Sequence, residues 1–106
     1  MSTAVDTAKP QSKPDVQPPK SWNVVLLDDD DHTYEYVMEL ARKLFGASEQ
    51  AAFVIACTVD NTGRAVLTTT HKELAELKQE QVHAFGADPR LPRSKGAMTA
   101  LLEPAV

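Results

Sequence analysis

Four consecutive aspartates, Asp28 to Asp31, interrupt the stretch VVLLDDDDHTYEYVMEL (residues 24–40), between an apolar run and a helical pattern. Like charges this close together repel one another, so water, a helix end or a cation must stabilise them. One interpretation is a solvated turn between a strand and a helix, in which one aspartate caps the helix. The other is a site for a cation, either a metal ion or the ammonium group of a ligand.

The acidic stretch matches a calcium loop only in part. Asp28, Asp30 and His32 alternate, and Glu39 falls at the twelfth position, as in such a loop. However, Thr33 stands where the sharp turn needs glycine, and Glu39 belongs to the helical pattern. We therefore expect no metal site and no cofactor.

A phosphoacceptor receiver domain is a second possibility. Residues 24–32 resemble the first strand and acidic pair of that family, with Asp60 and Lys95 as further matches. The receiver fold needs five strand–helix units and about 120 residues, more than the chain supplies after Trp22. A small receiver-like or cation-binding regulatory domain stays open as the alternative.

The histidines do not indicate catalysis. No serine or cysteine nucleophile motif accompanies them, and each lies in a turn or on a predicted helix, where we expect surface polar groups. The three are His32, His71 and His83. The sequence predicts that this protein is not an enzyme.

The segments around the acids predict the elements that position them. Residues 22–27 are a short apolar and β-branched run, typical of a buried strand. Apolar residues then recur at helical spacing from Val37 to Leu44, and Gly46 ends that helix. The acids should therefore lie at a strand-to-helix junction.

The next segment is ambiguous. AAFVIACTV (51–59) is continuously apolar and fits a buried strand or a buried helix. Ser48 as a cap and Glu49 in the first turn favour the helix. Cys57, the only cysteine, is predicted to be a small buried core residue, and it excludes a disulfide within the chain.

The remaining segments complete the expected fold. DNTG (60–63) is predicted to be a turn, 64–70 a strand and 97–103 a last strand. Thr70 and Glu73 can form a capping box for a third helix, which Gly86 ends. Its predicted apolar face consists of Leu74, Leu77, Gln81 or Val82, and Phe85. The order β-α-α-β-α-β predicts an α+β domain in which three helices pack on a three-stranded antiparallel sheet.

Composition divides the 106 residues into an arm and one domain. Residues 1–21 are predicted to be disordered, since the first 20 contain four of the seven prolines and no aromatic residue. Residues 22–106 form the core, whose acidic balance argues against nucleic acid as a partner. No apolar run suits a signal peptide or a membrane span, so we expect a cytoplasmic protein that contacts no membrane.

Two blocks in the domain resemble the ClpS family, adaptors that deliver substrates to the AAA+ Clp protease. WNVVLLDDDDHTYEYVMELARKLF resembles the opening strand, acidic turn and first helix, commonly written V-I-L-x-N-D-D-x-T-P-M-E-x-V. GRAVLTTTHKELAELKQEQV resembles the second strand and third helix, with an E-x-A-E-x-K core. The resemblance covers residues 22–103 and implies the same α+β fold, similar to the C-terminal domain of the ribosomal stalk protein.

The resemblance implies an adaptor for N-degron-bearing substrate proteins, whose N-terminal residue is Leu, Phe, Tyr or Trp. It places ammonium-binding residues at Asp28, Asp29 and Asp60, and apolar pocket walls at Tyr34, Val37, Ala56, Val59 and Met98. Glu73 and Lys78 match positions that face the N-terminal domain of the Clp AAA+ unfoldase. We expect both on an exposed helix face, in a protein that works as a monomer.

Several positions depart from the family pattern. Asp28 replaces an asparagine and Asp60 replaces a histidine, while Thr33 and Tyr34 replace the proline and methionine of T-P-M-E. The loop before residue 97 is also longer than usual. These changes predict either modified N-degron binding or a relative with altered or lost binding. Every altered ligand-contact position keeps an acceptor or an apolar group, which favours modified binding.

Overall fold

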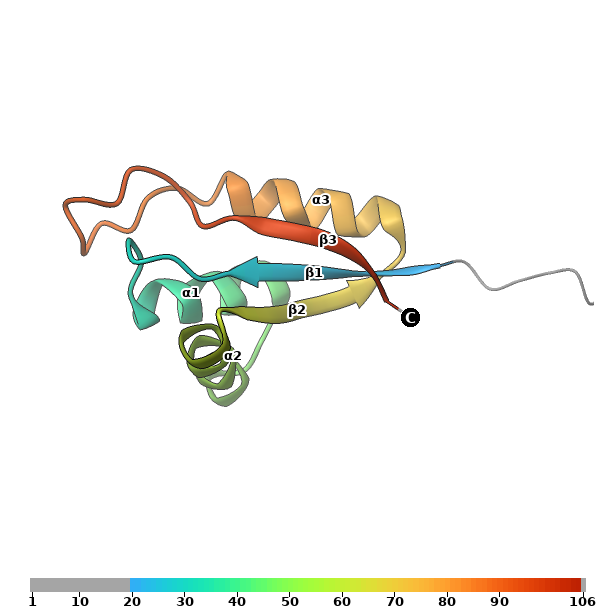
Figure 1. Cartoon of the computed structure of the whole chain (residues 1–106), viewed down its shortest axis with the longest axis horizontal. Helices are drawn as coiled ribbons and strands as arrows, with labels where there is room; N and C mark the ends of the chain where they lie inside the picture. The colour runs from blue at the N-terminus through green and yellow to red at the C-terminus, as the bar shows by residue number, and fades with distance from the viewer. Residues whose placement is uncertain (1–19, 106) are drawn as a thin grey trace, which may run out of the picture.

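The computed structural model describes residues 20–105, so the predicted disorder of the arm falls almost entirely outside the described residues. The elements, drawn in Figure 1, are β1 (Ser21–Leu27), α1 (Tyr34–Phe45), α2 (Glu49–Thr62), β2 (Arg64–Thr70), α3 (Lys72–His83) and β3 (Ala100–Ala105). The predicted element order and the α+β class are confirmed. The segment whose periodicity was ambiguous, residues 51–59, is helical.

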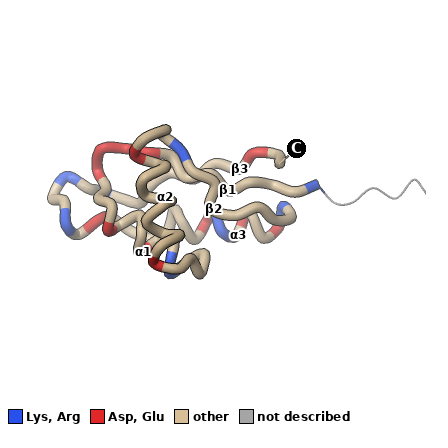
Figure 2. Tube along the Cα trace, turned by 90° about the horizontal axis from the view of Figure 1, so that it is seen from below, with Lys and Arg blue, Asp and Glu red and all other residues tan. Residues whose placement is uncertain are grey.

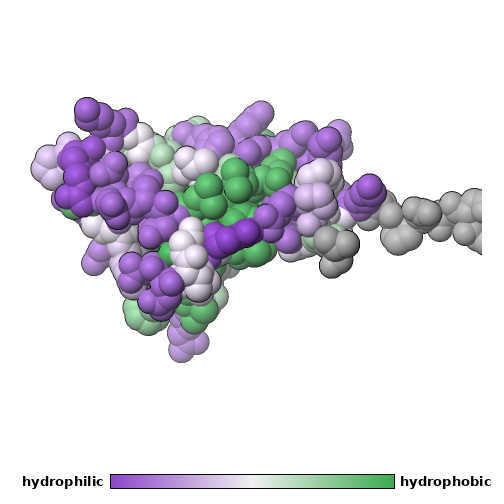
Figure 3. Space-filling model, viewed as in Figure 1, coloured by the Kyte–Doolittle hydropathy of each residue, from purple (hydrophilic) through white to green (hydrophobic). Residues whose placement is uncertain are grey.

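The sheet has the order β2-β1-β3, with the central strand β1 antiparallel to both neighbours. A bulge between Val24 and Val25 interrupts the pairing of β1 with β2. Val25 is fully buried. Its partners on the two edge strands, Val66 and Leu101, are exposed. In Figure 1 the strands lie in front of α1 and α3, and Figure 3 shows a central apolar patch on this face.

The core lies between the sheet and the helices. Its largest fully buried side chains include Leu26 from β1, Tyr36 and Leu40 from α1, Val59 from α2 and Val82 from α3. α3 packs against β1 and β3, while α2 packs against α1 and β2. Burying these side chains provides the main favourable free energy of folding and fixes the end of β1 against both α1 and α2.

Side-chain caps define the starts of α1 and α2. Thr33 Oγ1 accepts a hydrogen bond from the Tyr36 amide (3.1 Å), so none of the four aspartates caps α1. Ser48 Oγ accepts from the Ala51 amide (3.1 Å), as the sequence predicted for α2. Gly46 ends α1 in the left-handed conformation (φ 67°), which glycine adopts without the Cβ clash of other residues.

The predicted turn at residues 60–63 is wrong, because α2 continues through Thr62. Thr62 Oγ1 donates to the Thr58 carbonyl (2.7 Å), so this residue finds its partner inside the helix. Gly63 then ends the helix with φ 86° and donates its amide to the Val59 carbonyl (2.8 Å). Asp60 consequently projects from the last turn of a helix.

α3 starts one residue later than the predicted capping box allows. Thr70 is paired with Trp22 inside the sheet, and His71 caps the helix by accepting from the Leu74 amide (3.4 Å). The predicted apolar face is also wrong in part: Ala75 and Val82 are buried, whereas Leu74 and Leu77 are exposed. α3 thus turns Ala75 and Val82 toward the core, and Leu74 and Leu77 lie on its outer side.

The last strand begins at Ala100, three residues after its predicted start. The long loop before it remains irregular as far as Thr99, whose carbonyl accepts from the Leu27 amide (3.0 Å). Pro104 is tolerated within β3 because this is an edge strand, where one side of the backbone needs no partner. Cys57, predicted to be a buried core residue, is only partly buried.

Candidate functional site

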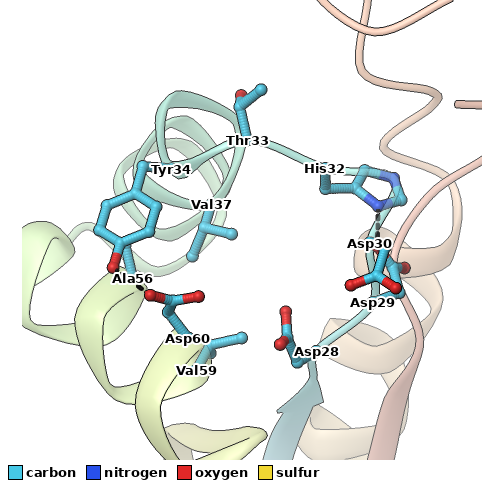
Figure 4. Close-up of a pocket in the computed structure, with 10 residues that line it drawn as sticks. All are labelled: Asp28, Asp29, Asp30, His32, Thr33, Tyr34, Val37, Ala56, Val59 and Asp60. Carbon is cyan, nitrogen blue, oxygen red and sulfur yellow. Dashed lines mark hydrogen bonds and ion pairs between the residues drawn. The ribbon is translucent and has the colours of Figure 1, made fainter.

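A cavity of about 230 Å³ opens where β1 ends, between the start of α1 and the last turns of α2. Figure 4 shows its lining: Asp28, Asp29, Asp30, His32, Thr33, Tyr34, Val37, Ala56, Val59 and Asp60. Val37, Ala56 and Val59 are buried side chains, while the acids stand at the exposed rim. The cavity thus has an apolar floor and a strongly acidic rim.

The structure brings together all predicted ammonium-binding and pocket residues except one. Met98 is not among the residues that line the cavity; it belongs to the core cluster that also contains Tyr36 and Ala100. The assignment of Met98 as a pocket wall therefore stays a prediction. The backbone explains why Asp28 and Asp60 meet: the Asp28 amide donates to the Gly63 carbonyl (2.9 Å), just beyond α2.

Two of the four consecutive aspartates have basic partners. Asp29 Oδ1 accepts from the Asp31 amide (2.9 Å) and lies 2.6 Å from His32 Nδ1. Arg93 Nε donates to Asp31 Oδ1 (3.0 Å) and to the Asp30 carbonyl (3.1 Å). Figure 2 shows acidic and basic segments side by side at the end of the molecule opposite the C-terminus.

The other acids at the rim keep their charge uncompensated. Among residues 20–105, no lysine, arginine or histidine forms an ion pair with Asp28, Asp30 or Asp60. Burial raises the pKa of Asp28, and so do the nearby charges of Asp60, Asp29 and Asp30, although a hydrogen bond from the Asp29 backbone opposes them. A cation entering the cavity would relieve this repulsion, because it favours the ionised form of every carboxylate around it.

Tyr34 and Asp60 close one side of the cavity. The Tyr34 hydroxyl donates to Asp60 Oδ2 (2.7 Å), which joins the first turn of α1 to the last turn of α2. This hydrogen bond, together with some burial and the Asp60 charge, raises the pKa of Tyr34 to about 12. In Figure 4 these residues face His32 and Asp29 across the cavity.

Sequence reasoning missed Asp88, which holds Thr33 at the start of α1 but does not line the cavity. The residue is 1% exposed, and its carboxylate accepts from the Thr33 amide (2.7 Å), the Thr33 hydroxyl (2.8 Å) and the Arg90 amide (3.0 Å). Burial alone would raise its pKa, but these hydrogen bonds outweigh burial and lower the pKa of Asp88 to about 2. An Asp-Pro pair such as Asp88-Pro89 indicates a turn, but nothing local in the sequence indicates that this carboxylate anchors the start of α1.

His32 also differs from its predicted role as a surface group. Its side chain is 3% exposed, and its ring packs on the Tyr36 ring with 4.4 Å between centroids. Its partners are the neighbouring Asp29 and the distant Gly96, whose carbonyl lies 2.7 Å from Nε2. No local sequence signal marks a contact between residues 64 positions apart.

The predicted docking residues lie on α3, outside the cavity lining. Glu73 is exposed, as predicted, but Lys78 is only partly exposed. Lys78 Nζ donates to the Leu44 carbonyl (2.6 Å) and lies 5.4 Å from the centre of the Phe45 ring. Lys78 therefore also stabilises the C-terminal end of α1.

Two features are absent from the part of the chain that the structure describes. None of its helices has the length and apolar character that crossing a membrane requires. Nor do its histidines, cysteines and acidic residues form any group of three that could hold a metal ion.

Comparisons with known proteins agree with this architecture. The family model described as "ATP-dependent Clp protease adaptor protein ClpS" matches residues 17–92. Two proteins named ATP-dependent Clp protease adapter protein ClpS are similar to this chain. The one from Hydrogenovibrio crunogenus is 31% identical, and the match covers 76% of this chain and 78% of the relative. The one from Nautilia profundicola is 32% identical, and the match covers 70% of this chain and 76% of the relative. A solved structure, Agrobacterium tumefaciens ClpS2 bound to L-phenylalaninamide, covers 83% of this chain and all of that one, at 26% identity and a TM-score of 0.71.

The family match spans most of the chain, including β1, the acidic turn and all three helices. The structural match also has the sheet and helices seen in this chain. Together the two matches favour the ClpS family over a receiver-like domain. The chain belongs to the ClpS family of ATP-dependent Clp protease adaptors.

Proposed function

We propose that this adaptor binds N-degrons in the cavity and delivers the attached proteins to a Clp AAA+ unfoldase. The main support for the proposal is that one cavity has both an apolar floor and a rim of carboxylates. The N-terminus of a protein that begins with Leu, Phe, Tyr or Trp offers the complement: an ammonium with three donors beside an apolar side chain. L-Phenylalaninamide, named as the ligand of the Agrobacterium relative, carries the same two groups.

The ligand's ammonium has acceptors on more than one side. Asp28 and Asp29 follow β1, while Asp60 comes from α2, so the three carboxylates converge from different elements. The Tyr34 hydroxyl occupies only Oδ2 of Asp60, and a carboxylate accepts several hydrogen bonds. The ammonium can therefore bind Asp60 while Tyr34 holds that side chain in place.

The test is calorimetric binding of a peptide that begins with Phe, compared with the same peptide acetylated at its N-terminus. Acetylation removes the positive charge and should abolish most binding. Asp29→Ala should weaken the free energy of peptide binding by about 2–5 kcal/mol, because it removes the carboxylate partner of the ligand's ammonium group. Glu35→Ala is the control, since Glu35 is an exposed acid in the first turn of α1 that does not line the cavity. Equal binding of the free and acetylated peptides would refute the proposal.

We further infer that α3 docks on the unfoldase through Glu73 and Lys78. Glu73→Ala should weaken unfoldase binding and leave both peptide affinity and thermal stability unchanged, because Glu73 is exposed and outside the cavity. Lys78→Ala should also lower the melting temperature, since it removes the hydrogen bond to the Leu44 carbonyl. Glu76→Ala, on the same helix, is the control. Unchanged unfoldase binding by the Glu73 variant would contradict this assignment.

The working unit is inferred to be a monomer. Size-exclusion chromatography with light scattering, with and without peptide, would check this inference.

A further inference from the structure

The His32 side chain connects the acidic rim to the long loop between α3 and β3. Its ring lies against the cavity but is almost fully enclosed, with 3% of the side chain exposed. Nδ1 lies 2.6 Å from Asp29 Oδ1, and Nε2 lies 2.7 Å from the Gly96 carbonyl oxygen. The Ser94 hydroxyl is a third, more distant neighbour, 3.3 Å from Nε2.

Both near partners of the ring are acceptors. An ionised carboxylate and a backbone carbonyl offer only lone pairs, so each bond needs a proton on the ring nitrogen that faces it. A ring that satisfies Asp29 and Gly96 together is therefore doubly protonated and positively charged. A neutral ring would leave one of these enclosed contacts without its hydrogen.

We propose that His32 is the positioning residue of the ammonium site, a role that rests on the proposed function of the cavity. The ring holds Asp29 by Oδ1 and leaves Oδ2, which accepts no hydrogen bond from residues 20–105, for the ligand. Through Gly96, the same ring transmits the position of the loop to the carboxylate. His32 does not touch the ligand's ammonium and acts only through Asp29.

The surroundings restrict the ring to this orientation. The Tyr36 ring packs against it, and the Tyr36 hydroxyl is anchored to the Gly86 carbonyl (2.5 Å) at the start of the loop. Arg93, from the middle of the loop, binds Asp31 and the Asp30 carbonyl. The acidic turn is thus held by Arg93 from the middle of the loop and by Gly96 near its end, and the Gly96 contact is the one that reaches Asp29 through His32.

Two substitutions separate the two contacts of the ring. In His32→Asn the amide nitrogen lies near the position of Nδ1 and can still donate to Asp29, but it cannot reach Gly96. In His32→Gln the amide nitrogen lies near the position of Nε2 and can donate to Gly96, but not to Asp29. If His32 positions Asp29, the Gln variant loses about tenfold in affinity for a Phe-starting peptide, as expected for one hydrogen bond to a charged group, and the Asn variant retains most of it.

A double-mutant cycle with Asp29→Asn supplies the decisive comparison. The loss caused by His32→Gln should disappear in the Asp29→Asn background, because His32 acts through that carboxylate. An equal loss in both backgrounds would overturn the proposal, as would losses in the two His32 variants that simply follow their melting temperatures.

Nuclear magnetic resonance distinguishes this proposal from the proposed function. In the ligand-free protein, both His32 ring nitrogens should carry protons, and the Asp29 carboxyl resonance should move in the Gln variant but not in the Asn variant. If the wild type binds no free N-terminus, the proposed function fails, and these spectra still decide the positioning role. A singly protonated ring, or an Asp29 resonance unaffected by His32→Gln, would refute it.

Discussion

The protonation of individual carboxylates sets the conditions under which the cavity can hold an ammonium group. Burial and neighbouring acids raise the pKa of Asp28 above its ordinary value of 3.8, so this carboxylate loses its charge earlier than an isolated one as the pH falls. The ligand's α-amino group has a reference pKa of about 7.7–8.0 and loses its charge on the alkaline side.

Peptide affinity should therefore be highest between these two titrations. It should fall as the pH drops toward the pKa of Asp28, and fall again as the pH rises above about 8. Added salt should weaken binding at every pH, because the rim charges are exposed to solvent. Calorimetry across this range checks the profile, and an affinity independent of both pH and salt would speak against an ionic site.

The buried Asp88 carboxylate should make the free energy of unfolding depend on pH in the acidic range. Its pKa is lowered to about 2 in the folded protein, below the ordinary value of 3.8. A lowered folded-state pKa stabilises the protein above the unfolded-state pKa, and the stabilisation is lost as the pH falls from about 4 to about 2. Asp88→Asn should lower the free energy of unfolding at neutral pH by about 1–2 kcal/mol and change it little near pH 2.

Urea denaturation of both proteins at neutral and acid pH measures this difference. Glu76→Gln, an exposed acid on α3, is a control that should leave stability unchanged at both pH values. An Asp88→Asn variant that is equally destabilised at both pH values would show that packing, and not ionisation, accounts for the loss.

Local sequence identified the residues of the cavity that lie on regular elements. Helical spacing placed Val37 on the buried face of its helix, whereas the assignment of Ala56 came from the family resemblance. His32 was misplaced because its surroundings depend on the loop between α3 and β3. The path of an irregular loop is set by contacts far away in sequence, and periodicity does not report such contacts.

At the scale of elements, the end of α2 decides where Asp60 points. Gly63 has φ 86°, and a Cβ at this position would have no neighbouring atom within 4 Å, so an alanine there would meet backbone strain and no steric clash. Gly63→Ala should lower the free energy of unfolding by about 1–2 kcal/mol. Gly96→Ala is the matched control, since that glycine lies outside the left-handed region and also faces open space.

Chemical denaturation of the two glycine variants tests this prediction. The Gly63 variant should also bind peptide more weakly, because the Gly63 carbonyl fixes the Asp28 amide beside α2. Equal stability of the two variants would mean that α2 can end without the left-handed residue.

The order of helices and strands followed from the sequence, but the helix ends did not. Asp60 and Asn61 favour turns, which led to a predicted turn where the helix actually continues. Their local preference is weak compared with the packing of α2 against α1 and β2, which carries the helix on to Gly63. Leu74 is likewise exposed because α3 turns Ala75 and Val82 toward the core, which the spacing of its leucines did not indicate.

At the scale of the whole molecule, residues 1–19 should be separable from ligand recognition. The cavity is lined by residues 28–60, and the first strand begins at Ser21. Deleting residues 1–19 should leave peptide affinity and melting temperature unchanged but abolish substrate delivery in a reconstituted degradation assay, if the arm engages the unfoldase during transfer. Full delivery by the shortened protein would contradict this role for the arm.

The pairing of Ser21 with Ala105 brings the first and last strands together at one end of the sheet. In Figure 1 this end lies opposite the acidic turn and the long loop. Residues paired across antiparallel strands lie about 5 Å apart, so a few glycines and serines could join them directly. New termini could then be opened in the loop between α3 and β3, away from Asp88, Arg93 and Gly96, giving a circularly permuted form of residues 21–105 for binding studies. A fluorophore or an affinity handle at such a terminus would sit beside the cavity and report its occupancy, while the sheet and the α3 face stayed unmodified.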